Sequence, residues 1–253
     1  MRVLTSTLVL LGLGIGLAPA LRASTTFSFT SGNGTSGGLC PSGAICFGSG
    51  AVTATAWQLS NTGASFSTAS LGQYSGGLGV CDTADNTTGC GTPQHAIDNN
   101  GYFDFVLLTF TQPISAPVTL ALNTFGQPYD TDITYFVGNC TPSSTSCNPS
   151  GKTVAQLSTI AGFSGTLNAH DDIYGPTGNR NVDLNLTGTG PAGVNWILVG
   201  ATTNSSYSGN DYFKLNAISY SSAVPEPATF GLAGAALLGL GLLRAKKRRS
   251  GSV

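Results

Sequence analysis

Charged side chains are scarce in this chain, and their scarcity excludes one class of function. Only 8% of the 253 residues are charged, and the chain contains a single glutamate. Between residues 24 and 222, three cations accompany ten aspartates, which gives a net charge of about −7. Nucleic-acid binding requires many cationic contacts to phosphates, and three cations cannot supply them. We therefore expect no nucleic-acid partner.

Histidine is also rare, with two residues, and no two of the six cysteines form a Cys-x-x-Cys pair. A zinc site needs closely spaced nitrogen and sulfur ligands, so we expect none. The cysteines instead occur as close neighbours in segments rich in turn residues, namely Cys40 and Cys46, Cys81 and Cys90, and Cys140 and Cys147. Local loop closure favours disulfides between these neighbours, although other pairings stay open. Such disulfides would fasten surface loops.

Residues that favour helices are few between residues 24 and 222, and no amphipathic helical period is found there. Short runs rich in Val, Thr, Phe and Tyr, bounded by turn residues, predict β-strands instead. These runs lie at residues 25–30, 51–59, 102–111, 118–123, 133–137, 153–157, 182–187, 196–201 and 212–220.

The pattern within these runs predicts how the strands pack. FDFVLLTF and WILVGA are continuously apolar, as the central strands of a sandwich are. Other runs alternate apolar and polar residues, which places one face on a core and the other toward water. Residues 24–222 are therefore predicted to form an all-β domain, an antiparallel β-sandwich of jelly-roll type.

Residues 1–23 have the pattern of a secretory signal peptide. Arg2 precedes an apolar run at residues 8–17, and small residues mark two candidate cleavage sites, after Ala20 and after Ala23. The run has about ten residues, which is too short to cross a bilayer. We therefore predict export into oxidising surroundings, where disulfides persist.

Residues 223–253 differ in composition from the rest of the chain. Uncharged residues run from Ala228 to Leu243 and would form a helix of about 24 Å. With local thinning of the bilayer, this helix is expected to span the membrane. A basic cluster follows, consisting of Arg244, Lys246, Lys247, Arg248 and Arg249. Such cations stay on the cytoplasmic side, so the body is expected to lie outside.

Pro225, Glu226 and Pro227 stand directly before the apolar run. The two prolines keep the chain extended there, as a protease needs its substrate to be. The tripeptide, the apolar helix and the basic end together resemble the PEP-CTERM sorting signal of exported bacterial proteins. This resemblance implies recognition and cleavage by exosortase, a membrane-embedded cysteine peptidase. The body would then be released or transferred to the cell surface, often in bacteria that produce extracellular polysaccharide.

A second resemblance lies in the body. The pattern Gly-Leu-Gly-Val, His-x-Ile-Asp-Asn, Asp-x-Val-Leu-x-x-Phe is similar to one found in exosortase-dependent surface proteins. Its positions here are residues 77–80, His95, Ile97, Asp98, Asn99, Asp104, Val106, Leu107 and Phe110. The resemblance implies a secreted β-sandwich of this surface class and no particular activity.

Two kinds of ligand site are candidates in the body. Clustered loop oxygens suit calcium, and Asp98 and Asn99 are the strongest candidates for a structural calcium ion, although Asp and Asn also cap turns. Aromatic residues in polar loops can stack on sugars, and the candidates are Tyr129, Tyr174 and Tyr207. We identify no catalytic residues and expect a non-enzymatic surface or extracellular-matrix protein. A secreted carbohydrate-binding module is the alternative, and a secreted hydrolase is the third hypothesis.

Overall fold

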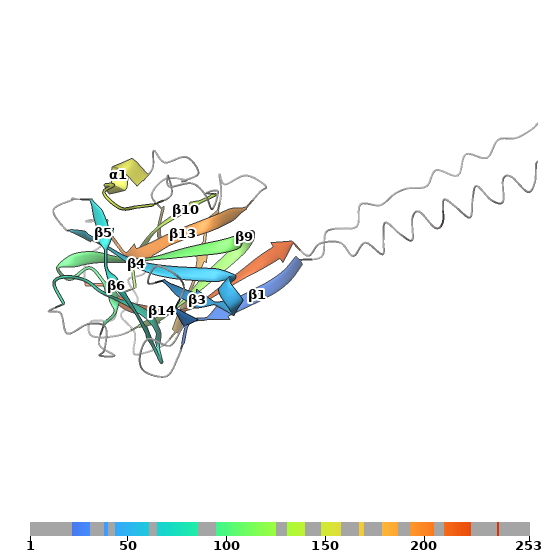
Figure 1. The fold of residues 1–253 in the computed structure, drawn as a ribbon, viewed down its shortest axis with the longest axis horizontal. Helices are drawn as coiled ribbons and strands as arrows, with labels where there is room; N and C mark the ends of the chain where they lie inside the picture. The colour runs from blue at the N-terminus through green and yellow to red at the C-terminus, as the bar shows by residue number, and fades with distance from the viewer. Residues whose placement is uncertain are drawn as a thin grey trace, which may run out of the picture. The chain divides into compact units, whose positions relative to one another are not determined.

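A computed structural model describes residues 22–30, 38–39, 44–60, 65–85, 95–124, 131–139, 148–157, 167–169, 179–186, 193–204, 210–223 and 237. Residues Ala23–Ala223 form one compact unit (Figure 1). Residues Met1–Arg22 and Val224–Val253 form another, of which only Arg22 and Leu237 are described. The division into signal peptide, domain and sorting segment stays a prediction.

The first of two antiparallel sheets has the order β2-β3-β4-β9-β13-β10-β11, and β5 pairs with the other end of β4. Its strands are β2 (Gly38–Leu39), β3 (Ile45–Phe47), β4 (Val52–Ser60), β5 (Phe66–Thr68), β9 (Tyr102–Thr124), β10 (Ile133–Gly138), β11 (Leu167–Ala169) and β13 (Val194–Ala201).

The second sheet is built around β14 (Tyr212–Ala223), which pairs with β9 along one edge. Along its other edge β14 pairs in turn with β8 (Ile97–Asp98), β7 (Gly77–Cys81) and β1 (Arg22–Ser28). The sheet is completed by β6 (Ser70–Tyr74), which pairs with β7, and β12 (Asn179–Leu184), which pairs with β9.

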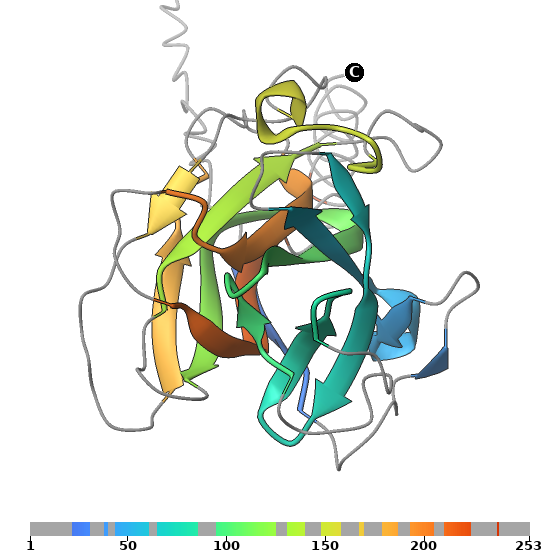
Figure 2. The ribbon, with the colours of Figure 1, turned by 90° about the vertical axis from the view of Figure 1, so that its left-hand side faces the viewer.

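The long strand β9 belongs to both sheets. Its residues 102–110 pair with β4 and β13, and its residues 118–124 pair with β12 and β14. The strands therefore curve round a common interior (Figure 2). The predicted all-β, antiparallel class is confirmed.

Alternation along β9 separates two apolar clusters. Val106, Leu108 and Phe110 pack in the main core between the sheets, with Val199 and Leu215 from other strands. Phe105 and Leu107 point the other way, into a smaller cluster on the outside of the first sheet with Trp57 and Trp196. The two continuously apolar runs are buried on both faces for this reason, as the sequence predicts.

One predicted strand is wrong. Residues 153–157 do not form a strand, and α1 (Val154–Leu157) occupies this place. The side chains of Thr153 and Gln156 form a capping box, in which the Thr153 hydroxyl accepts the Gln156 N–H at 3.2 Å and Gln156 Oε1 accepts the Thr153 N–H at 2.9 Å. Leu157 then packs into the outer cluster.

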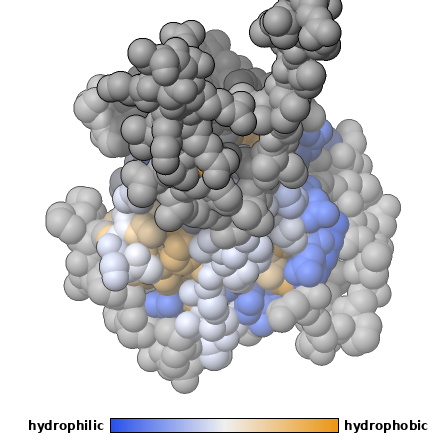
Figure 3. Space-filling view, turned by 90° about the vertical axis from the view of Figure 1, so that its right-hand side faces the viewer, coloured by the Kyte–Doolittle hydropathy of each residue, from blue (hydrophilic) through white to orange (hydrophobic). Residues whose placement is uncertain are grey.

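The two ends of the compact unit lie side by side, because β1 pairs with β14. The hydroxyls of Thr26 and Ser219 lie 2.8 Å apart, and the rings of Phe27 and Tyr220 stack with centroids 6.0 Å apart. Figure 3 views the molecule from the side on which β14 finishes in Figure 1 and shows hydrophobic and hydrophilic surface next to each other. Thus the strands with which the compact unit begins and ends are neighbours in one sheet.

Two of the six cysteines lie in the described residues, Cys46 on β3 and Cys81 on β7. Both are disulfide-bonded and neither is a free thiol. Their predicted partners Cys40 and Cys90, and the pair Cys140 and Cys147, lie outside the described residues, so the pairing stays a prediction.

The predicted membrane helix from Ala228 to Leu243 also falls outside the described residues, except for the exposed Leu237. Among the residues that the structure describes, no helix is both long enough and apolar enough to span a membrane.

Candidate functional site

Four aspartates gather where β7, β8 and β9 meet, and we call Asp82, Asp85, Asp98 and Asp104 the acidic site. Asp82 follows the last residue of β7, Asp98 ends β8, and Asp104 is the third residue of β9. The segment before β8 is held to β7 by the Val80 N–H, which donates to the Ala96 carbonyl at 3.0 Å. The residues of the second sequence resemblance are thus brought into one region.

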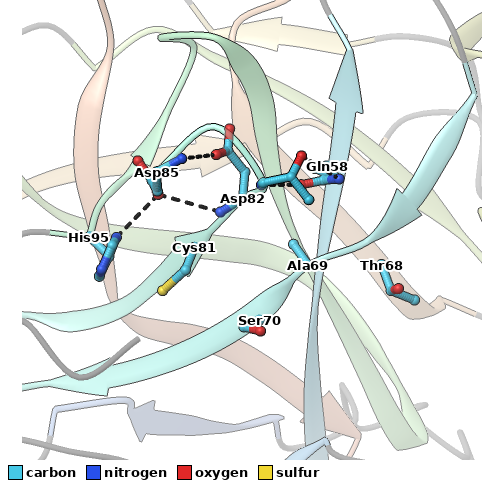
Figure 4. A pocket seen from close by; sticks show the side chains of 9 residues that line it. Gln58, Thr68, Ala69, Ser70, Cys81, Asp82, Asp85 and His95 are labelled. Atoms are coloured by element: carbon cyan, nitrogen blue, oxygen red, sulfur yellow. Dashed lines mark hydrogen bonds and ion pairs between the residues drawn. The ribbon is translucent and has the colours of Figure 1, made fainter. Parts of the chain in front are cut away.

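A cavity of about 320 Å³ opens beside the acidic site (Figure 4). Seven of its nine lining residues carry a hydroxyl, amide, carboxylate or imidazole group, and the full lining is Gln58, Thr68, Ala69, Ser70, Cys81, Asp82, Thr83, Asp85 and His95. None of these lining residues is Phe, Tyr or Trp, so the described lining lacks the large aromatic ring on which sugars usually stack.

Asp82 and Gln58 fix the loop that borders the cavity. Asp82 Oδ1 accepts the N–H groups of Ala84 at 2.7 Å and Asp85 at 2.9 Å. From β4, Gln58 Oε1 accepts the Thr83 N–H at 2.8 Å, while its Nε2 donates to the Ser67 hydroxyl at 3.1 Å. Burial raises the pKa of Asp82, and these backbone donors oppose the shift. The carboxylate therefore shapes the loop in the way that an aspartate turn does.

Asp85 lies between the Asp82 backbone and the ring of His95 (Figure 4). Its Oδ2 is 3.1 Å from His95 Nδ1, and the side chains are 30% and 14% exposed. A carboxylate in this position orients the imidazole and fixes which ring nitrogen it engages.

Asp104 is the most unusual member of the acidic site. It is completely buried opposite Gln58 in the register of β9 and β4, and neither of its carboxyl oxygens has a hydrogen-bond partner. Burial raises the pKa of Asp104 well above its ordinary value, and the charges of Asp98, Asp82 and Asp85 raise it further. The nearby backbone N–H of Asp98 has the smallest influence and lowers it.

Asp98 is also buried, with 7% of its surface exposed. Its Oδ1 accepts the Asn100 N–H at 2.9 Å, which helps to close the turn into β9. Burial raises the pKa of Asp98 to about 7, with smaller contributions from Asp85 and Asp82.

The side chain of Asn99, the other predicted calcium ligand, pairs with Asp211. Its amide forms a two-way pair with Asp211, in which Asn99 Nδ2 donates to Asp211 Oδ2 at 2.8 Å and the Asp211 N–H donates to Asn99 Oδ1 at 3.0 Å. Asp211 also accepts the N–H groups of Asp132 and Thr202, each at 3.0 Å. The Asn99 side chain therefore ties the loop before β9 to the start of β14.

A buried lysine, Lys214, lies on β14. Lys214 is 2% exposed, and its Nζ donates to the His95 carbonyl at 2.8 Å and lies 3.7 Å from the centroid of the Tyr74 ring. Burial lowers the pKa of Lys214 to about 8 and raises the pKa of Tyr74 to about 12. This contact holds the segment before β8 against the second sheet.

The glycines of Gly-Leu-Gly-Val have steric reasons for being glycine. A Cβ on Gly77, whose φ is +121°, would overlap the Leu215 carbonyl oxygen. A Cβ on Gly79 would overlap the His95 carbonyl oxygen. The motif thus lets β7 approach both β14 and the segment that leads to the acidic site.

The predicted sugar contacts Tyr129, Tyr174 and Tyr207 lie outside the described residues. Of the predicted calcium ligands, only Asp98 belongs to the acidic site. In the part of the chain with described coordinates, no three His, Cys, Asp or Glu side chains already form a cluster that would hold a metal ion. Sequence reasoning missed Gln58, Asp211 and Lys214, which have partners that are distant in the chain. The one available signal is a polar residue within an apolar strand run, as at Gln58.

The described part of the chain is thus an all-β unit with a buried acidic site. Residues 223–249 match the PEP-CTERM protein-sorting motif. The chain therefore carries a PEP-CTERM signal, which implies export and sorting by exosortase. The match begins at Ala223, the residue with which β14 ends. No curated protein and no solved structure matches the chain.

Proposed function

We propose that the compact unit Ala23–Ala223 is a non-enzymatic component of the cell surface or extracellular matrix, delivered there by exosortase. The observation that carries this proposal is the PEP-CTERM motif at residues 223–249, which begins where the last strand ends. We assign residues 228–243 to a temporary membrane helix and the following cations to its cytoplasmic end. The jelly-roll form of the sandwich and the disulfide pairs are part of the same proposal.

The position of the motif supports processing at the surface of the folded unit. The last strand β14 runs to Ala223, so the chain between the folded sheet and Pro225 is a single residue. The prolines prevent the strand or a helix from continuing regularly through the motif. Exosortase would therefore meet an extended segment immediately beside the unit.

The polar contacts in and around the acidic site support a non-enzymatic unit. Asp82 of the acidic site, and the neighbouring Asn99 and Asp211 outside it, are engaged with backbone N–H groups or with each other, and these contacts hold loops in place. Carboxylates used in this way act as structural acceptors, whereas a catalytic carboxylate is directed at a substrate. The secreted hydrolase is for this reason the weaker hypothesis.

The proposal is tested by the intact mass of the protein recovered from membrane and surface fractions of its own cells. A mature product ending near residues 224–227 in the surface fraction is the expected result. The triple variant Pro225→Ala, Glu226→Ala and Pro227→Ala should accumulate uncleaved in the membrane fraction, while the exposed-site control Asp183→Asn should be processed normally. A surface-bound product that still carries residues 228–253 would overturn the proposed route.

A carbohydrate-binding module is a second candidate, favoured by the polar lining of the cavity near His95. Hydroxyl, amide and carboxylate groups of this kind hydrogen-bond to sugars. Extracellular polysaccharide from the same cells should then retain the full chain in a pull-down assay. Thr68→Val combined with Ser70→Ala should weaken retention if the cavity is the binding site, and Asp183→Asn should not.

A further inference from the structure

Asp104 and Asp98 are buried carboxyl groups that lie on either side of one tight turn. The turn residues 99–101 join the end of β8 to the start of β9, and the Asp98 backbone N–H is close enough to Asp104 to affect its pKa. Both oxygens of Asp104 lack a hydrogen-bond partner, although the residue is completely buried. Native proteins rarely leave a buried polar group in this condition unless a ligand or a bound water completes it.

The carboxylates around Asp104 all carry charge of one sign. Asp98, Asp82 and Asp85 each raise the pKa of Asp104, and the basic side chain in contact with one of them is His95, whose ring lies against Asp85. Lys214 faces Tyr74 and the His95 carbonyl. A buried carboxylate without a partner is strongly destabilising in its ionised form, so this site is stable only when it holds a proton or a cation.

We propose that Asp98 and Asp104 bind a hard divalent cation of the calcium class in the exported protein. The available donors are oxygens, which calcium prefers, and two carboxylates can supply up to four of its ligands. Main-chain carbonyls and water would complete the shell, since the described side chains do not form a three-residue metal cluster. Calcium tolerates such an irregular shell, whereas magnesium demands an octahedral one.

The fold gives this site a route to solvent and a negative electrostatic potential that attracts cations. Asp98 is 7% exposed, while Asp104 is fully enclosed, so an ion would enter past Asp98. Asp82 and Asp85 border the same region and add negative potential without being required as ligands. Asn99 takes no part, because both ends of its amide are paired with Asp211.

Thermal unfolding of the full chain in a mild non-ionic detergent tests the inference. The protein is first treated with a chelator, and intrinsic fluorescence follows the buried Trp57 and Trp196. At pH 8, calcium at about ten times its Kd should raise the Tm by about 3–6 °C. Millimolar concentrations are the relevant range, because extracellular calcium modules bind there.

Two isosteric variants identify the ligands. Asp104→Asn and Asp98→Asn should each abolish the calcium-dependent shift in Tm, and both should fold, because they remove an uncompensated charge. The control Asp183→Asn changes an exposed carboxylate that accepts the Thr119 hydroxyl, and it should keep the full shift. Equal shifts in Asp104→Asn and the unchanged chain would overturn the inference, as would no shift in the unchanged chain.

Terbium luminescence provides a direct binding measurement. Tyr212 lies opposite Asp98 in the register of β14 and β8, so it can transfer excitation to an ion at this site. Sensitised emission that calcium displaces, and that Asp98→Asn and Asp104→Asn lose, is the expected result. Emission that survives both substitutions would place the ion elsewhere. Because none of these measurements depends on residues 223–253, their failure is separable from failure of the sorting proposal.

Discussion

The ammonium nitrogen of Lys214 lies 3.7 Å from the centroid of the Tyr74 ring, inside a unit that contains only three cations between residues 24 and 222. The same nitrogen donates to the His95 carbonyl at 2.8 Å. Burial lowers the pKa of Lys214 to about 8, so the ring and the carbonyl stand in for water around a charge that the fold has largely desolvated. The contact also connects β14 to the segment that carries the acidic site.

Substitutions of Tyr74 should separate the contribution of its ring from that of its hydroxyl. Tyr74→Phe keeps the face over Lys214 and loses only the hydroxyl, which lies 3.8 Å from Cys81 Sγ. Tyr74→Leu removes the face, so we expect its free energy of unfolding to be lower than that of Tyr74→Phe by about 2 kcal/mol or more. Denaturant titration at pH 7 measures the difference. Equal losses in the two variants would show that the ring does not stabilise the cation.

The acidic site should make the free energy of unfolding depend on pH in chelator-treated protein. Asp98 has a folded pKa of about 7, against an ordinary value near 4. Between about pH 4 and pH 7 the folded state therefore keeps a proton on Asp98 that the unfolded state has lost. Stability should therefore fall as the pH rises from about 4 to about 7 and then level off. Asp104 shifts in the same direction.

Asp98→Asn tests this dependence. The amide cannot ionise, so the variant should exceed the unchanged chain in stability at pH 8, by up to about 4 kcal/mol, and differ little at pH 4. Asp183→Asn should follow the unchanged chain at both values. Parallel pH profiles for Asp98→Asn and the unchanged chain would assign the pH dependence to other groups.

The central strands could be predicted from sequence because their environment is uniform. The apolar residues of FDFVLLTF alternate between the main core and the outer cluster, so both faces of this part of β9 are largely apolar, and Asp104 and Thr109 are the polar residues in the run. The sequence did not show that residues 102–111 and 118–123 belong to one strand, since continuity depends on pairing with two sheets.

The helix α1 and the polar contacts of the site escaped prediction for different reasons. At α1 the β-branched residues Thr153 and Val154 favour a strand, but a local capping box outweighs that preference. Asn99 and Asp211 are far apart in the chain and meet only because β14 pairs with β8. Such a contact leaves no local pattern in the sequence. Asp98 and Asp104, by contrast, are close in sequence, and both belong to the pattern that resembles exosortase-dependent surface proteins.

Asp211 should be one of the least replaceable polar residues of the unit. It is 1% exposed and accepts the N–H groups of Asp132 and Thr202 together with the Asn99 amide. Asp211→Ala leaves these donors buried without an acceptor, and a loss of about 3 kcal/mol or more is expected. Asp211→Asn retains one carbonyl oxygen and should lose less. Hydrogen exchange at Thr202 should accelerate in Asp211→Ala, and unchanged protection there would contradict the role assigned to the carboxylate.

The glycines at residues 77 and 50 provide a matched test of why β7 requires glycine. Both have positive φ, +121° at Gly77 and +89° at Gly50, but a Cβ at Gly50 would meet no atom within 4 Å. Gly50→Ala should therefore cost only the backbone strain, about 1–2 kcal/mol. Gly77→Ala adds an overlap with the Leu215 carbonyl, for a further loss of about 1–3 kcal/mol.

The effect of Gly77→Ala should extend from β7 to the acidic site, because β7 holds the segment before β8 through the hydrogen bond from the Val80 N–H to the Ala96 carbonyl. In Gly77→Ala, displacement of β7 from β14 should weaken calcium-dependent stabilisation, while in Gly50→Ala it should be retained. Thermal unfolding of both variants with and without calcium measures this. If Gly77→Ala lowers the Tm yet keeps the full calcium shift, the approach of β7 to β14 supports the sheet alone and does not position Asp98 and Asp104.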